Sequence, residues 1–230
     1  MTSPNQYLII IITFSIYWKV KNLAFTGFTE RDFDTFQLKG LDTRMEAIQT
    51  RIQPKFQEIG SELVDYLSAQ LGNEVYLHIA RHARRTVNPP NDTWLAIADN
   101  KRGYKQHPHF QVGLFDDHVF VWMALIYELP YKKEIAESLI KHYDEIKQLP
   151  DNFVISMDHM KKDSINLEDL QMKQLERFRD VKKAEFLIGL QLPFNDSRIK
   201  DGEKFIQTVK DTYDKLIPLY RIALQSRITK

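Results

Sequence analysis

The sequence contains no cysteine among its 230 residues. Disulfide bonds, thiolate nucleophiles and cysteine-ligated zinc or iron–sulfur sites are therefore excluded. A chain without disulfides fits a reducing compartment, and we predict a cytoplasmic location.

The chain also lacks an excess of either charge, because 32 Lys and Arg residues face 31 Asp and Glu residues. Non-specific binding along nucleic acid needs many phosphate contacts at once, and this balance does not supply them. With 43% hydrophobic and 27% charged residues, the composition is that of a globular protein with one well-buried core.

No apolar run is long enough to span a membrane unaided. The longest, residues 7–18, has twelve residues, whereas a spanning helix needs roughly 17–25. This run is an extension from a misplaced start codon, an extra strand or docked segment, or a membrane-surface anchor. We predict an atypical apolar extension over residues 1–22 and one domain over residues 23–230, since no linker, repeat or low-complexity tract divides the latter.

Helical spacing of apolar residues frames the chain. Thr43 and Glu46 have the spacing of a capping box, and Pro54 ends that first helix or sits in the first turn of the next, which stops at Gly72. Further helices are predicted over residues 131–149, after an N-cap near Asn166, and at the carboxyl end, where Pro218 kinks or restarts the helix.

Between and after these helices the pattern becomes β-branched and aromatic, in short runs bounded by turn formers. The predicted strands are residues 75–79, 93–97, 109–115, 118–127, 153–157 and 184–190, with a hairpin turn at Asp116-Asp117. This order predicts an α+β fold: a single-domain two-layer sandwich with a mostly antiparallel sheet covered by helices.

The most informative stretch is the polar block over residues 78–109. It holds four of the seven histidines and six Lys or Arg residues against two acids. A local excess of cations in a neutral chain predicts an anion site, and arginine forms bidentate pairs with phosphate or carboxylate. The predicted ligand-binding residues are Arg81, Arg84, Arg85, Asn88, Asn91, Lys101, Arg102 and Tyr104.

Each part of this block also has a plainer interpretation. The arginines, which share one side if their segment is helical, could be a solvated face. The rigid loop from Asn88 to Asn91 could simply turn a corner, and residues 101–105 could form a polar hairpin loop. Tyr104 could stack on a base or ring, although no phosphate-loop motif is present.

Histidine spacing raises the question of a metal. His78 and His82 are four apart and His107 and His109 are two apart, but the nearby arginines would repel a dication, and we predict no metal there. We select His82 and His109 as candidates for proton transfer, since histidine titrates near neutrality. A second polar cluster, residues 158–162, is a solvated loop by default.

Several motifs together resemble one known family. Residues 25–28, 40–47, 82–94 (HARRTVNPPNDTW), 101–105, 108–113 and 158–161 look like the YktB-like family of uncharacterised bacterial proteins, and the resemblance covers about residues 25–230. It implies a single α/β domain, a two-layer sandwich grouped with biotin-ligase-like folds, and it implies no function. The family's sequences typically begin just before Phe25. This favours the interpretation that the first 22 residues are an extension from a misplaced start codon.

The leading functional hypothesis is a binder of a phosphorylated or carboxylated small ligand, including a nucleotide. The alternatives are a nucleic-acid-binding module that uses the same patch and a protein-interaction module without catalysis. The sequence names no reaction, no cofactor and no membrane partner.

Overall fold

The computed structural model describes residues 25–226, so the predicted extension over residues 1–22 lies outside the described residues. Seven strands form one sheet in the order β1-β2-β3-β4-β7-β5-β6, and every pairing in the described part is antiparallel. The strands are β1 (Tyr76–Ile79), β2 (Thr93–Ala98), β3 (His109–Leu114), β4 (His118–Leu125), β5 (Val154–Ser156), β6 (Ile165–Asn166) and β7 (Phe186–Pro193). The predicted α+β class and antiparallel sheet are confirmed.

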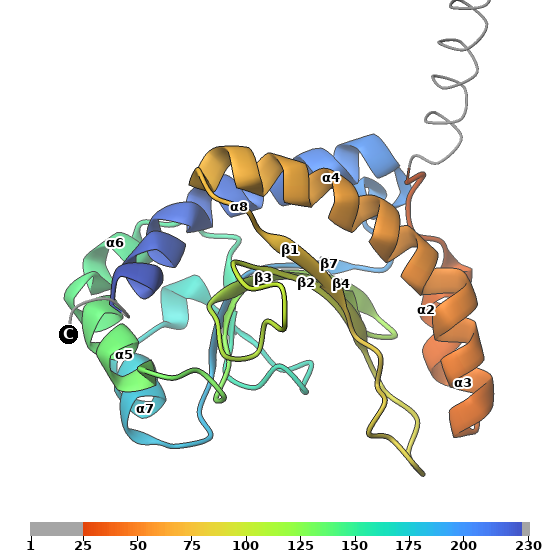
Figure 1. Cartoon of the computed structure of the whole chain (residues 1–230), viewed down its shortest axis with the longest axis horizontal. Coiled ribbons are helices and arrows are strands. Elements are labelled where there is room, and N and C mark those ends of the chain that lie inside the picture. The colour runs from red at the N-terminus through yellow and green to blue at the C-terminus, as the bar shows by residue number, and fades with distance from the viewer. Residues whose placement is uncertain (1–24, 227–230) are drawn as a thin grey trace, which may run out of the picture.

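The helices lie mainly on one side of this sheet, which arches beneath them (Figure 1). They are α2 (Glu30–Asp34), α3 (Leu41–Ala47), α4 (Gln53–Leu71), α5 (Lys132–Lys141), α6 (Tyr143–Lys147), α7 (Met172–Asp180) and α8 (Gly202–Gln225). Helices α4 and α8 cover the convex face, and the β1–β2 and β2–β3 loops hang below the concave face. No helix within residues 25–226 is both long enough and apolar enough to cross a bilayer.

Alternating side chains give the sheet two different faces. Leu95, Phe110 and Val112 point to the convex side and join the main core with α4 and α8, where Phe56 and Tyr213 are fully buried. The Tyr213 hydroxyl donates a hydrogen bond to the backbone oxygen of Gln111 at 2.9 Å, which fastens α8 to β3. This burial on the convex side leaves the other face for the polar residues.

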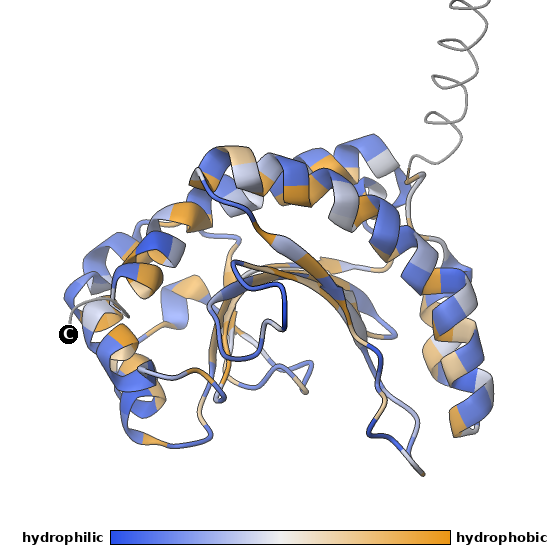
Figure 2. Cartoon of the chain, in the orientation of Figure 1, coloured by the Kyte–Doolittle hydropathy of each residue, from blue (hydrophilic) through white to orange (hydrophobic). Residues whose placement is uncertain are grey.

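The concave face carries a second, smaller cluster of aromatic and small residues. Trp94, Phe120 and Trp122 are nearly buried here, together with Ala96 and Ala124. The loops that cover this face are largely hydrophilic (Figure 2). A sheet face roofed by polar loops rather than by a helix is where buried polar side chains gather in this fold.

Several local predictions are corrected by the structure. Helix α3 begins at Leu41 after Gly40, so the capping box predicted at Thr43 is wrong: the positive φ of Gly40 lets the helix start earlier. The helix predicted over residues 131–149 is divided at His142 into α5 and α6. Asn166 precedes a short 3₁₀ turn, and α7 starts only after Gln171.

Other helix signals are confirmed. Pro54 lies in the first turn of α4, where its missing N–H costs nothing, and Gly72 ends α4 in the left-handed conformation. Helix α8 runs through Pro218 as one helix, so the alternative that the helix restarts there is wrong. The strand ends move by a few residues: β4 stops at Leu125, and β7 covers Phe186–Pro193 rather than 184–190.

A substitution in β7 tests the close approach of two central strands. Gly189 pairs with Trp122, and a Cβ at Gly189 would overlap the backbone oxygen of Val121. Because a backbone atom cannot rotate away, we expect Gly189→Ala to lower the free energy of unfolding by about 2 kcal/mol. Urea denaturation measures this. Gly103→Ala is the control, since nothing lies within 4 Å of its Cβ position, and an equal loss in both variants would contradict the packing argument.

Candidate functional site

Trp94 is the residue around which the concave-face site is built. Its indole Nε1 donates a hydrogen bond to the Tyr104 hydroxyl at 3.0 Å, and its ring lies edge-on to His82 and His159 at centroid distances of 5.5 and 5.8 Å. The Tyr104 ring in turn lies 4.9 Å from that of His109. One tryptophan therefore brings together the β1–β2, β2–β3 and β5–β6 loops.

Asp92, two residues before Trp94 on the same side of β2, is the most unusual group of this site. Its side chain is 1% exposed, and neither carboxylate oxygen has a hydrogen-bond partner among the described residues. Burial raises the pKa of Asp92 to about 6, although the charges of His159 and Arg85 act to lower it. A buried carboxylate without partners is costly, so its presence points to a function rather than to stability.

His159 and Glu185 form a buried pair on the same face. The Nδ1 of His159 lies 2.7 Å from Glu185 Oε2, and the backbone N–H of His159 donates to the same oxygen at 2.8 Å. Burial acts to lower the pKa of His159, but the hydrogen bond and charge of Glu185 raise it above its ordinary value. The Glu185 side chain is only 3% exposed. Because it is fixed by this burial, its hydrogen bond holds the imidazole of His159 in one orientation.

The sequence pattern described as "Domain of unknown function (DUF1054)" matches residues 28–220 of the chain. The chain belongs to the DUF1054 family. A UPF0637 protein of Oceanobacillus iheyensis is 64% identical over 201 residues, which are 87% of this chain and 98% of that protein. UPF0637 proteins of Shouchella clausii and Listeria monocytogenes serotype 4a are 55% and 54% identical, over 86% and 88% of this chain and 95% and 100% of theirs. The predicted YktB-like resemblance is confirmed.

The motif blocks that carry this family resemblance converge in the DUF1054 fold. Blocks 82–94, 101–105, 108–113 and 158–161 are separated in sequence, yet each contributes a side chain to the ring contacts around Trp94 and Tyr104. The concave face is therefore where these four blocks meet.

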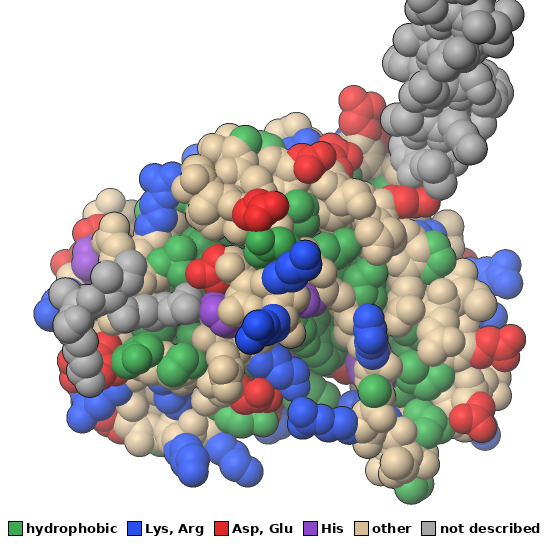
Figure 3. Space-filling view, in the orientation of Figure 1, with side chains coloured by type: hydrophobic (Ala, Val, Ile, Leu, Met, Phe, Trp, Pro, Cys, Tyr) green, Lys and Arg blue, Asp and Glu red, His purple; other side chains and the backbone are tan. Residues whose placement is uncertain are grey.

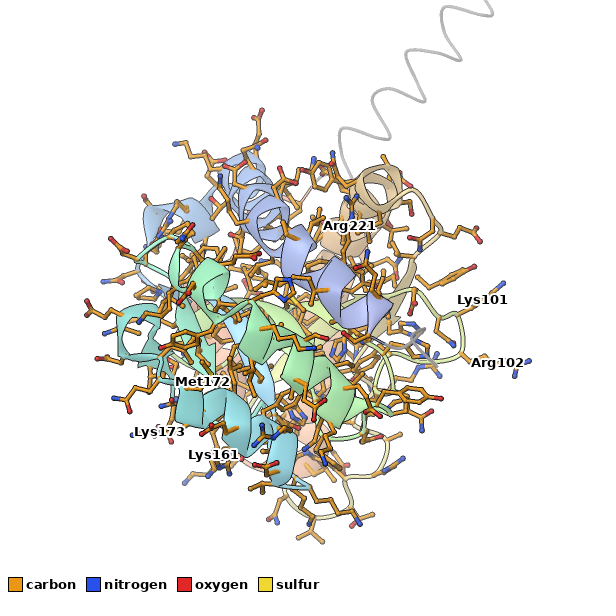
Figure 4. All side chains as sticks on the ribbon, turned by 90° about the vertical axis from the view of Figure 1, so that its left-hand side faces the viewer. Lys101, Arg102, Lys161, Met172, Lys173 and Arg221 are labelled. Atoms are coloured by element: carbon orange, nitrogen blue, oxygen red, sulfur yellow. The ribbon has the colours of Figure 1, made fainter. Side chains whose placement is uncertain are left out.

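Four of the predicted ligand-binding residues line one cavity of about 750 Å³, which we call the basic pocket. They are Arg81, Lys101, Arg102 and Tyr104; the remaining lining is His78, Ile79, Asn100, Gly103, Lys105, Gln106, His107 and Glu128. Figure 3 shows Lys and Arg side chains gathered over the loops on this side of the molecule. Lys101 and Arg102 extend from their loop into solvent (Figure 4).

The other predicted ligand-binding residues lie elsewhere. Residues 80–92 form a loop, not a helix, so the shared helical side considered for the arginines does not exist. Arg84 is exposed, and Arg85 donates to the backbone oxygen of Asn88 at 3.4 Å. Asn91 lines a separate hollow of about 300 Å³ with residues of other loops. The structure thus divides the predicted block in two.

Tyr104 is placed as a wall of the basic pocket. Its ring packs against His78 and His109, and its hydroxyl accepts the hydrogen bond of Trp94. Burial raises the pKa of Tyr104 to about 12, so the phenol stays protonated. The predicted stacking of Tyr104 on a ligand ring stays a prediction.

The two histidines selected for proton transfer occupy different surroundings. His109 is fully buried between the backbone oxygen of His107 and the side-chain amide of Gln111, which occupy its two ring nitrogens, and burial lowers its pKa to about 3. His82 adopts a positive φ of 50°, with its Nε2 3.2 Å from Thr93 Oγ1, and burial lowers its pKa to about 4. Both are neutral at pH 7, and their role in proton transfer stays a prediction.

Sequence reasoning missed a second cavity of about 620 Å³, which we call the α7 groove. Its cationic lining is Lys161, Lys173, Arg177 and Lys183, and its other lining residues are Met157, Asp158, Asp163, Ser164, Ile165 and Gln174. Lys161 and Lys173 lie on the same side of the molecule in Figure 4. The Lys161-Lys162 pair was the only local signal, since the other cations come from α7 and the turn before β7.

Proposed function

We propose that this DUF1054 protein binds an anionic small ligand, phosphorylated or carboxylated, in the basic pocket. The observation that carries the proposal is the charge left unpaired there. Arg81, Lys101 and Arg102 make no side-chain ion pair or hydrogen bond within residues 25–226, whereas Glu128, the acid of the lining, already pairs with Lys105 at 3.3 Å.

An anion is the ligand class that this excess of donors favours. Two guanidinium groups and an ammonium group supply charge-assisted hydrogen bonds to phosphate or carboxylate oxygens, and arginine does so in a bidentate manner. A cavity of about 750 Å³ lies within the range of small-molecule sites, and it has room for a nucleotide-sized ligand. The proposal keeps the cytoplasmic location predicted from the lack of cysteine.

The test is a thermal-shift screen of the full chain, with chelator present, against nucleotides, sugar phosphates, dicarboxylates and short oligonucleotides. A ligand at 100 times its dissociation constant should stabilise the fold by about 2.7 kcal/mol. We expect Arg81→Gln and Arg102→Gln each to weaken a hit by about tenfold or more, measured by titration calorimetry.

Two controls sharpen the result. Lys141→Gln removes an exposed cation of α5, and Arg84→Gln removes an exposed arginine that does not line the basic pocket; neither should change the affinity. No hit, or a hit that is insensitive to Arg81 and Arg102, would overturn the proposal. Preferential binding of oligonucleotides with a steep salt dependence would favour the nucleic-acid alternative instead.

A further inference from the structure

Three chemically suitable ligand groups lie together where β7 begins and the β5–β6 loop crosses the concave face. One ligand atom from each of Asp158, His159 and Glu185 lies within 4.8 Å of the other two. Two atoms bound to one metal ion at about 2.1 Å each are about 3–4 Å apart, so these groups need only small side-chain rotations to share an ion.

A second, independent observation points into the same place. Asp92 is 1% exposed and keeps both carboxylate oxygens unpartnered among the described residues. It lies on the Trp94 side of β2, and the Trp94 ring touches that of His159. Asp92 and His159 therefore lie on the same, concave face of the sheet.

We propose that Asp158, His159 and Glu185 bind a divalent transition-metal ion, with Asp92 adding negative charge from the same face of the sheet. A single imidazole among carboxylates is a donor set for Mn²⁺, Fe²⁺ or Zn²⁺ rather than for Ca²⁺ or Cu⁺. The charge of the ion offsets the cost of burying Glu185 and Asp92.

An ion pair and a hydrogen bond made by the three groups compete with a metal ion at this site. Lys161 lies 3.7 Å from Asp158, but both side chains are largely exposed, and an exposed pair of this kind contributes little. The hydrogen bond between His159 Nδ1 and Glu185 holds these two groups side by side, and an ion bound to both atoms would replace the proton between them. Metal ligands need such alignment before the ion arrives, and they release protons when they bind it.

The surroundings give this ion a place to act. Asp158 also lines the α7 groove, whose other walls carry Lys161, Lys173, Arg177 and Lys183. An ion at Asp158 would therefore lie at the edge of a cavity of about 620 Å³ whose cations attract a negatively charged group. This site is separate from the basic pocket, and neither proposal depends on the other.

Metal binding can be measured directly on the full chain, after bound metal has been stripped with a chelator and the chelator has been dialysed away. We expect one Mn²⁺ per chain by electron paramagnetic resonance of the free ion, and competition for that site by Zn²⁺ in titration calorimetry. Glu185→Gln and Asp158→Asn should each weaken Mn²⁺ binding by about 100-fold or more, because even groups that only orient metal ligands contribute about 10–100-fold.

The variants are chosen so that loss of folding cannot be mistaken for loss of a ligand. Glu185 is buried, but the Asp158 side chain is 44% exposed, so Asp158→Asn leaves the core unchanged. Asp151→Asn removes an exposed carboxylate just before β5 and is the matched control. Failure of the wild-type chain to bind Mn²⁺ or Zn²⁺, or equal binding by Asp158→Asn and Asp151→Asn, would overturn the proposal.

Discussion

Replacing Arg44 with alanine should lower the free energy of unfolding by about 4 kcal/mol, the largest loss expected from any single change considered for this fold. Arg44 is 8% exposed, and its guanidinium group binds two loops at once. It donates to the backbone oxygen of Leu38 at 3.0 and 2.7 Å, to that of Pro90 at 2.9 Å and to Asn91 Oδ1 at 3.4 Å. Alanine leaves the backbone oxygens of Leu38 and Pro90 without this donor, and the bond to Pro90 is the buried one.

The loss of Arg44 should also affect the concave-face site, because Pro90 and Asn91 immediately precede Asp92. We expect Arg44→Ala to increase hydrogen exchange in residues 80–92 as well as to lower the urea midpoint. Arg51→Ala is the control: its side chain is near the surface and makes one hydrogen bond, to the backbone oxygen of Arg31 at 3.4 Å. If Arg51→Ala were as destabilising as Arg44→Ala, the clamp between α3 and the β1–β2 loop would be refuted.

The strands were predictable because each is a short apolar run between turn formers. Their exact ends were not, because β2, β3 and β4 are buried on both faces and show no change in polarity where pairing stops. Helix starts depend on single backbone angles, such as that of Gly40, which the pattern of side chains does not report.

The sequence indicated where cationic side chains are concentrated, but not how the fold separates them. The β1–β2 and β2–β3 loops leave opposite ends of β2. Arg81, which follows β1 almost directly, still lines the cavity with Lys101, whereas Arg84 and Asn91 lie farther along the β1–β2 loop and do not line it. The two loops are close in sequence within residues 78–109. In the fold, however, their attachment points are separated by the length of β2, and a six-residue strand is about 20 Å long.

Glu185 illustrates a limit of a different kind. It is a single acid among lysines, 26 residues after His159, and only the pairing of β5 with β7 brings the two together. Asp92 was visible within the NPPNDTW motif, but its composition suggested a turn. Its lack of hydrogen-bond partners is a property of the folded chain alone.

Replacing Asp92 with asparagine should stabilise the metal-free protein at pH 7 by up to about 3 kcal/mol, since one pKa unit corresponds to about 1.36 kcal/mol. The pKa of Asp92 is about 6 in the fold, against an ordinary value of 3.8 in the unfolded chain. Between about pH 4 and pH 6 the folded protein holds a proton that the unfolded chain has lost. The contribution of Asp92 to stability therefore falls as the pH rises through this window, and the full penalty is present above about pH 6.

Urea denaturation of wild type and Asp92→Asn in chelator, at pH 4, 5, 6 and 7, measures this difference. The two proteins should be nearly equal at pH 4, and the variant should become the more stable one as the pH rises. Asp151→Asn, which removes an exposed carboxylate, should follow the wild type throughout. A constant difference at every pH would show that Asp92 is not titrating in the fold.

The same variant distinguishes a structural from a functional reason for keeping this carboxylate. If Asp92 serves the fold, Asp92→Asn lowers stability; if it serves a site, the variant gains stability and loses Mn²⁺ affinity together. The second pair of results is expected, because a buried group that costs stability is retained where a ligand needs its charge.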